Sequence, residues 1–246
     1  MQTDDFYKEQ IAKEGFAIIN DVFSAEETDT VLRIIEETDT SGPAFRKTGD
    51  LFAIRQFLKE IPTAGHLIFT ERLTTIITQL FGGGYFVVKS IYFDKPAQSN
   101  WFVAYHQDLT ISVDRKVDVD GFERWTVKQN QFAVQPPVGI LEDNFTIRIH
   151  LDDTDEDNGA LRVIPGSHLK GIYRPEMIGR EEENETICRI CKGGIMVMKP
   201  LLMHSSGRTM NDNKRRVVHI EFSRQVLAGG LQWAEYLKTN LTLGSA

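Results

Sequence analysis

Cysteine is scarce in this sequence of 246 residues. The only two cysteines are Cys188 and Cys191, in the segment "ICRIC". A structural zinc site of the four-cysteine type would need a second such pair, and the sequence has none. Because the neighbours are apolar, we expect the pair to lie in a buried strand, in a protein from a reducing compartment.

Long apolar runs and an excess of basic residues are also absent. No apolar run approaches the roughly 20 residues that cross a bilayer, and the polar, acidic start "MQTDDFYKEQ" is not typical of a signal peptide. We therefore expect a cytoplasmic location and no membrane partner. The net charge of −7 argues against nucleic-acid binding, which normally requires a basic face.

The remaining composition is that of an ordinary globular protein, with 41% hydrophobic and 26% charged residues. The length is at the upper end of a single domain. Because the sequence contains neither an internal repeat nor a low-complexity linker, we expect residues 1–246 to form one domain.

The first part of this domain, residues 1–83, is expected to be mostly helical support. Segments 4–15 and 65–84 predict helices that end at glycines, and 16–23 predicts a strand. Ser24, followed three residues later by Glu27, forms a capping box that predicts the start of another helix.

The second part, residues 84–224, changes to short runs rich in β-branched and aromatic residues, which predict strands. In "FTIRIHLD" (145–152) the apolar residues alternate with Thr146, Arg148, His150 and Asp152, which should share the opposite face. Helices followed by many short strands predict a mainly β protein with flanking helices, built on a barrel or sandwich core. Residues 111–140 interrupt the strands and form either a lid or binding loop or a surface excursion. Residues 225–246 are expected to contain a C-terminal helix.

Two His-x-Asp pairs are candidates for metal binding: His106 with Asp108, and His150 with Asp152. Residues i and i+2 of a strand face the same side, so each pair can offer two ligands to one ion. With a second histidine the pair makes a two-histidine, one-carboxylate triad, which suits non-haem Fe(II). His106 ends an apolar strand, whereas His150 runs into a polar acidic turn, and this difference favours His106.

The C-terminal strand and the segment before it supply the remaining candidates. His204 follows an apolar strand, where a turn should begin, and "RRVVHIEFS" follows as a strand from Arg215 to Ser223. Val218, Ile220 and Phe222 should face the helices, which places Arg215 on the interior face. A buried arginine there can bind a carboxylate through two parallel hydrogen bonds. A surface arginine pair on an edge strand is the alternative.

In order along the chain, "HQD" at 106–108, "NGALRVIPGSH" at 158–168, His204 and Arg215 resemble the phytanoyl-CoA dioxygenase family of Fe(II)/2-oxoglutarate oxygenases. The resemblance implies a double-stranded β-helix (jelly-roll, cupin-like) core. It also implies that His106, Asp108 and His204 are the iron ligands and that Arg215 binds the 5-carboxylate of 2-oxoglutarate. Ser206 matches an assisting hydroxyl, and Arg148 occupies a position near the co-substrate.

The activity implied by this resemblance is hydroxylation of an unactivated C–H bond of a small organic substrate, using Fe(II), 2-oxoglutarate and O2 and releasing succinate and CO2. An aspartate at position 108 favours hydroxylation over halogenation, because related halogenases have a small residue there. His168 is placed in a turn away from the metal, and Gln107 should face away from it. Trp125 and Lys128 in the insertion are candidate substrate contacts. The alternatives are a non-oxidative metal enzyme, such as a hydrolase or isomerase, and a catalytically silent binding module. Substrate identity and oligomeric state remain open.

Overall fold

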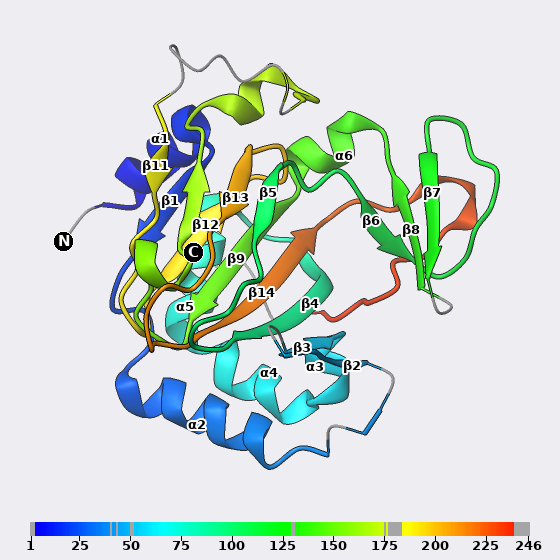
Figure 1. Cartoon of the computed structure of the whole chain (residues 1–246). Helices are drawn as coiled ribbons and strands as arrows, with labels where there is room; N and C mark the ends of the chain where they lie inside the picture. The colour runs from blue at the N-terminus through cyan, green and yellow to red at the C-terminus, as the bar shows by residue number, and fades with distance from the viewer. Residues whose placement is uncertain are drawn as a thin grey trace.

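The structure is a computed structural model that describes residues 3–39, 41–42, 44–49, 52–128, 131–174, 176 and 184–238. Two antiparallel sheets face each other and form the expected double-stranded β-helix core (Figure 1). The larger sheet has the strand order β1 (Phe16–Ile19), β12 (Ile195–Met198), β9 (Phe145–His150), β14 (Arg215–Ser223), β4 (Phe86–Lys95), β3 (Phe52–Arg55), β2 (Phe45–Lys47). The smaller has the order β11 (Thr186–Ile187), β10 (Leu161–Val163), β13 (His204–Ser206), β5 (Val103–His106).

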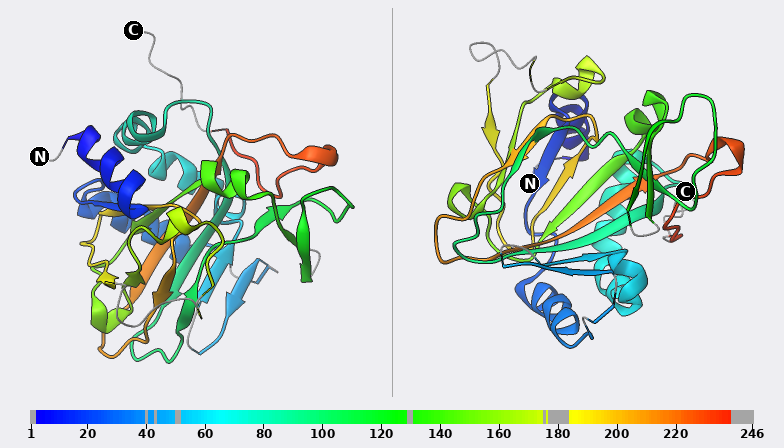
Figure 2. Two further views of the ribbon diagram at one scale, coloured as in Figure 1. Left: turned by 90° about the horizontal axis from the view of Figure 1, so that it is seen from above. Right: turned by 45° about the vertical axis from the view of Figure 1, so that its right-hand side comes forward.

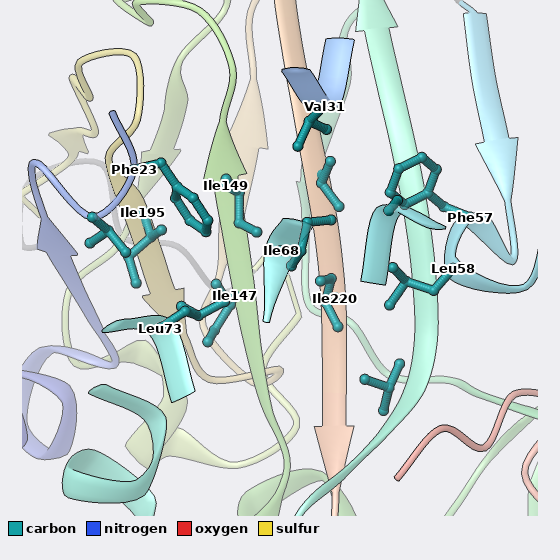
Figure 3. Close-up of a cluster of buried hydrophobic side chains, with 14 of the residues drawn as sticks. Phe23, Val31, Phe57, Leu58, Ile68, Leu73, Ile147, Ile149, Ile195 and Ile220 are labelled. Atoms are coloured by element: carbon teal, nitrogen blue, oxygen red, sulfur yellow. The ribbon is translucent and has the colours of Figure 1, made fainter. Parts of the chain in front are cut away.

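Helices from the N-terminal region cover the outer face of the larger sheet. They are α1 (Asp4–Glu14), α2 (Ala25–Glu36), α3 (Phe57–Glu60), α4 (Pro62–Ile68) and α5 (Glu71–Phe81). The predicted capping box of Ser24 and Glu27 begins α2, and Gly15 ends α1 in the left-handed conformation. Figure 3 shows Leu73 and Ile68 from these helices packed against Ile147 and Ile220 of the sheet. The predicted faces of β9 and β14 are therefore confirmed for their apolar residues.

Two predictions for the N-terminal region need correction, and one element there was not predicted. Residues 65–84 do not form one helix, because the Thr70 side chain accepts a hydrogen bond from the Leu73 backbone N–H and starts α5 separately from α4. The predicted strand 16–23 stops at Ile19, where the chain bends toward α2. The hairpin of β2 and β3 was not predicted, and it extends the larger sheet by pairing with β4.

The described part of the 111–140 insertion contains regular secondary structure. It contributes β6 (Ile111–Val113), β7 (Glu123–Lys128) and β8 (Gln131–Gln135), which form a separate sheet of order β6-β8-β7, followed by α6 (Val138–Asp143). Figure 2 shows this sheet projecting from one side of the jelly roll. Its apolar face packs in a second hydrophobic cluster with Val88 and Leu201 of the core.

The predicted C-terminal helix is wrong for the part of residues 225–246 that the structure describes, which ends at 238. Apart from a short 3-10 turn, η4 (Ala228–Gly230), this segment is extended. Trp233 packs in the second cluster, and the Glu235 carboxylate accepts a hydrogen bond from the Ser90 backbone N–H at 2.7 Å. Such tertiary contacts outweigh the modest helix propensity of the segment. Residues 239–246 of the predicted helix lie outside the described residues. Among the described residues, no helix has the length and hydropathy to cross a membrane.

We expect one substitution in the hydrophobic core between the larger sheet and the helices to lower stability strongly. Phe145 is fully buried, and its ring stacks on those of Phe81 and Phe222 at centroid distances of 3.7 and 4.8 Å. Phe145→Ala should lower the free energy of unfolding by about 3–5 kcal/mol, which corresponds to a fall in melting temperature of roughly 10 °C for a domain of this size. Thermal unfolding followed by circular dichroism measures it. Phe6→Ala, at a half-exposed ring, is the control and should change the melting temperature by far less.

Candidate active site

Three side chains gather between the two sheets where β5 and β13 lie side by side. His106 ends β5 and is paired directly with His204, the first residue of β13. Asp108 lies two residues beyond β5, and its carboxylate oxygens are 3.8 Å from His106 Nε2 and 3.9 Å from His204 Nε2. The three ligand atoms lie within 4.8 Å of one another, and this spacing can hold one metal ion. His204 thus lies in a short strand and not, as predicted, in a turn.

The hydrogen bonds of the two imidazoles prepare them for a metal. His106 Nδ1 lies 2.9 Å from the carbonyl oxygen of Ala104, and His204 Nδ1 lies 2.8 Å from that of Leu202. Since a carbonyl only accepts, each Nδ1 carries the proton and each Nε2 keeps its lone pair. Burial lowers the pKa of His204 to about 4, which favours the neutral imidazole that binds metals. Burial raises the pKa of Asp108, but the positive charges around it more than offset this effect and favour the carboxylate.

The interior face of the larger sheet forms the floor beneath these three side chains. The registers of β4, β14 and β9 place interior side chains in successive rows across the sheet. The rows are Lys95 with Arg215, then Phe93 with Val217 and His150, then Ile91 with His219 and Arg148, then Lys89 with Glu221 and Thr146. Several of these side chains line a cavity of about 160 Å³ together with the triad.

One end of this floor is strongly cationic. Arg148 and Arg215 line the cavity, are buried, and form no salt bridge with any described carboxylate. Arg148 Nε and Arg215 Nε and Nη1 are buried and have no hydrogen-bond partner among the described residues. Burial lowers the pKa of Arg215 to about 9, and repulsion by Arg148 adds to this effect. Lys95 lies beside Arg215, and burial followed by that repulsion lowers its pKa to about 7. Buried cations that keep N–H groups without an acceptor are costly unless an anion binds to them.

Toward the other end of the floor, hydrogen bonds connect charged and polar groups whose charges compensate one another. Arg148 Nη1 lies 3.1 Å from His219 Nδ1, and His219 Nε2 lies 3.1 Å from Glu221 Oε1. Arginine can only donate, so His219 accepts at Nδ1 and donates from Nε2 to Glu221. Lys89 Nζ donates to the same oxygen at 2.8 Å. Asp108, His219 and Glu221 also lie within metal-binding distance of one another, but Lys89 and Arg148 already supply positive charge there, which disfavours a dication.

The structure separates the two His-x-Asp pairs clearly. His150 is buried on the interior face, where its Nδ1 bonds the Thr154 hydroxyl at 2.8 Å. Asp152 was predicted to share that face, but β9 ends at His150. The Asp152 carboxylate instead accepts hydrogen bonds from the Arg216 guanidinium at 2.7 and 2.9 Å. Arg216 also reaches Glu36 of α2, so the pair lies on the helix side of the sheet.

The other predicted residues also have definite positions. Gln107 points away from the triad and bonds the carbonyls of Gly171 and Leu201. His168 lies in a turn, η2 (Ser167–Lys170), as predicted. Ser206 lines the cavity, with its hydroxyl donating to the Gly159 carbonyl at 3.0 Å. Trp125 packs in the second hydrophobic cluster, and the side chain of Lys128 lies outside the described part of the structure.

Sequence reasoning assigned no role to Lys95, Lys89, His219 or Glu221. The alternation of β14 carried a signal for His219 and Glu221, because both share the face of Arg215. Lys95 becomes significant only through strand register, which places it beside Arg215. The structure explains why glycine follows Asn158 in the "NG" segment. Gly159 has φ +87°, and a Cβ on it would lie 2.7 Å from Lys95 Nζ.

Comparison with known proteins finds a curated relative. The ectoine dioxygenase of Bordetella bronchiseptica is 26% identical over 169 residues, covering 65% of this chain and 48% of that protein. The chain therefore spans about half the length of this curated relative.

Two solved structures share the fold. The alpha-ketoglutarate-dependent carbocyclase SnoK from nogalamycin biosynthesis superposes with a TM-score of 0.66 at 15% identity, covering 98% of this chain and 97% of SnoK. The epimerase SnoN in complex with Fe3+, alpha-ketoglutarate and nogalamycin RO superposes with a TM-score of 0.64 at 12% identity, covering 95% and 94%.

The family assignment comes from the sequence itself. Residues 11–217 match the phytanoyl-CoA dioxygenase family, and this match includes every candidate ligand and Arg215. The matched region also contains both sheets of the jelly roll, except for residues 218–223 of β14. The chain therefore belongs to the phytanoyl-CoA dioxygenase family of Fe(II)/2-oxoglutarate-dependent oxygenases.

Proposed function

We propose that this protein is an Fe(II)- and 2-oxoglutarate-dependent dioxygenase that hydroxylates an unactivated C–H bond of a small organic molecule. In this proposal His106, Asp108 and His204 hold the iron. Their two imidazoles and one carboxylate are the donor set that suits non-haem Fe(II) and leaves coordination positions free.

A single observation carries the proposal: the triad lines the same cavity as two buried arginines whose guanidinium groups keep nitrogens without a hydrogen-bond partner among the described residues. A metal site alone accounts for the triad but not for the arginines. A dicarboxylate held between the metal ligands and Arg215 would account for both. Arg215 binds its distal carboxylate in this arrangement, and Arg148 and Lys95 add positive charge nearby.

The residues around the metal site orient its ligands, assist co-substrate binding and exclude water. When bound, iron with 2-oxoglutarate and O2 supplies the oxidising chemistry, releasing succinate and CO2. The hydrogen bonds from His106 Nδ1 to the Ala104 carbonyl and from His204 Nδ1 to the Leu202 carbonyl fix both rings for coordination. Phe93, Trp101 and Val103 line the cavity with apolar surface, which limits access of water to the reacting centre. Ser206 is proposed to assist co-substrate binding. For this its hydroxyl would rotate away from the Gly159 carbonyl, to which it donates in this structure.

The proposal predicts that the full-length protein, loaded anaerobically with Fe(II), binds 2-oxoglutarate with the appearance of a visible charge-transfer band. On exposure to O2 it should release succinate, even slowly without substrate. Succinate quantified by mass spectrometry is the measurement, and metal-free protein is the control. If 2-oxoglutarate neither binds nor turns over, with or without candidate substrates, a hydrolase, an isomerase or a silent binding module becomes the better reading. A product that gains one oxygen atom separates hydroxylation from other oxidative outcomes.

A further inference from the structure

A second and larger cavity, of about 530 Å³, lies beside the metal-site cavity. Lys89 and Ile91 line both cavities, so the two adjoin along β4. The larger one is lined by the insertion sheet, the end of β3, the middle of β4 and the extended segment 233–235. Figure 2 shows that the C-terminal segment runs beside the insertion. We call this space the side chamber.

A β-bulge accounts for the position of the side chamber. The register between β14 and β4 shifts between Glu221 and Phe222, which pair with Lys89 and Val87. Val88 is the extra residue, so it packs toward the insertion, while Val87 packs among the outer helices. The bulge lets Val88 line the side chamber, while Lys89 beside it lines both cavities.

The insertion contributes a short polar row to the chamber wall. Ser112 pairs with Ala133 across β6 and β8, and Thr126 pairs with Ala133 across β8 and β7. Directly paired residues share a face, and all three line the chamber. Val127, the next residue of β7, does not line the chamber and is 52% exposed.

Most charged groups bordering the chamber already have partners. Lys89 is paired with Glu221, and the Asp114 carboxylate accepts from Arg115 and from the backbone N–H of Gln232. Glu235 accepts from the Ser90 backbone N–H and hydroxyl. Arg55 is the remaining cation, and it donates to the Gln131 amide oxygen at 3.0 Å. The chamber therefore differs sharply from the cationic end of the metal-site cavity.

The uncharged lining is amphipathic. Hydroxyl and amide groups come from Thr110, Ser112, Thr126, Gln56 and Gln131, and apolar surface comes from Trp233, Phe132, Val113 and Ile91. Indole and phenyl faces pack well against the C–H face of a ring, and neutral hydroxyls and amides bond its substituents. A polyanion such as a CoA thioester would instead require a cluster of unpaired cations.

We propose that the side chamber is the substrate site, and that it accepts an uncharged, hydroxyl-bearing ring compound which passes its reactive C–H bond over Lys89 and Ile91 toward the metal. This inference rests on the proposed function, because a substrate site presupposes turnover at the triad. The volume of about 530 Å³ is within the range of small-molecule sites.

A binding experiment that does not depend on turnover tests the chamber. Saturation-transfer NMR on the full-length protein should detect at least one of myo-inositol, methyl glucoside and methyl galactoside, and should not detect octanoyl-CoA. Ala133→Trp fills the chamber and should weaken that binding roughly tenfold or more, since even one misplaced methylene costs about 10–200-fold. Thr126→Trp, on the edge strand β7, is a second filling variant in case Ala133→Trp fails to fold. Val127→Trp is the matched control and should bind normally.

Other outcomes overturn the assignment. These are binding of none of the three ring compounds, equal binding by the filled variants and the control, or preferential binding of octanoyl-CoA. In the iron-loaded wild type the bound compound should also accelerate succinate formation, and binding without acceleration contradicts a substrate role. If no succinate forms under any condition, the proposed function fails, whereas the NMR result still decides whether the chamber binds such compounds.

Discussion

Replacing Arg215 with alanine is expected to raise the concentration of 2-oxoglutarate needed for half-maximal succinate formation by about 30-fold to several thousand-fold. Loss of one partner from a buried, hydrogen-bonded charge pair costs about 2–5 kcal/mol. Arg215 is 2% exposed, and two of its guanidinium nitrogens have no partner among the described residues. Removing it should therefore weaken the binding of the 2-oxoglutarate carboxylate by the full amount. Iron affinity should change little, because Arg215 is not among the three metal-binding candidates.

Arg216→Ala is the matched control, since it removes the same group from the next position of the same strand. Arg216 faces the helices, where it pairs with Asp152 and approaches Glu36. Its removal should lower the melting temperature and leave the 2-oxoglutarate requirement unchanged. Titrations of both variants with 2-oxoglutarate at saturating iron, and with iron at saturating 2-oxoglutarate, measure the two effects separately. If Arg216→Ala impairs 2-oxoglutarate binding and Arg215→Ala does not, the co-substrate does not bind at the cationic end of the cavity.

The strands that carry the site could be predicted because their patterns are simple. In β9 and β14 every second residue is apolar and packs against the helices, so the opposite face had to be the interior. This reasoning placed Arg148 and Arg215 correctly. It failed at Asp152, because alternation holds only within a strand and β9 ends two residues earlier.

The errors elsewhere arise where tertiary contacts override local signals. Segment 65–84 is helical on both sides of a break, and only the hydrogen bond to the Thr70 side chain reveals the break. The C-terminal segment has a helix-compatible pattern, yet Trp233 and Glu235 bind it to β6 and β4 in extended form. The bulge at Val88 has no sequence signal that single-strand periodicity can detect, and so the side chamber could not be predicted.

Alanine at Asp108 or His204 is expected to abolish iron-dependent turnover and to weaken iron binding by on the order of 100-fold or more. Even the outer hydrogen-bond partners of metal ligands contribute about 10–100-fold in affinity, so removal of a ligand should cost at least as much. Asp108 is the more informative of the two. Its carboxylate lies within 4 Å of both imidazole Nε2 atoms, and no other described carboxylate completes a candidate metal group with His106 and His204.

The rejected His-x-Asp pair supplies the control for this prediction. Asp152→Ala removes a carboxylate at the same spacing from a histidine, but on the helix side of the sheet, where it bonds Arg216. It should lower stability while iron binding and succinate formation persist. Metal content after anaerobic loading, measured by elemental analysis, and succinate release together separate the two carboxylates. Full activity in Asp108→Ala, or loss of iron only in Asp152→Ala, would mean that the metal does not bind where β5 meets β13.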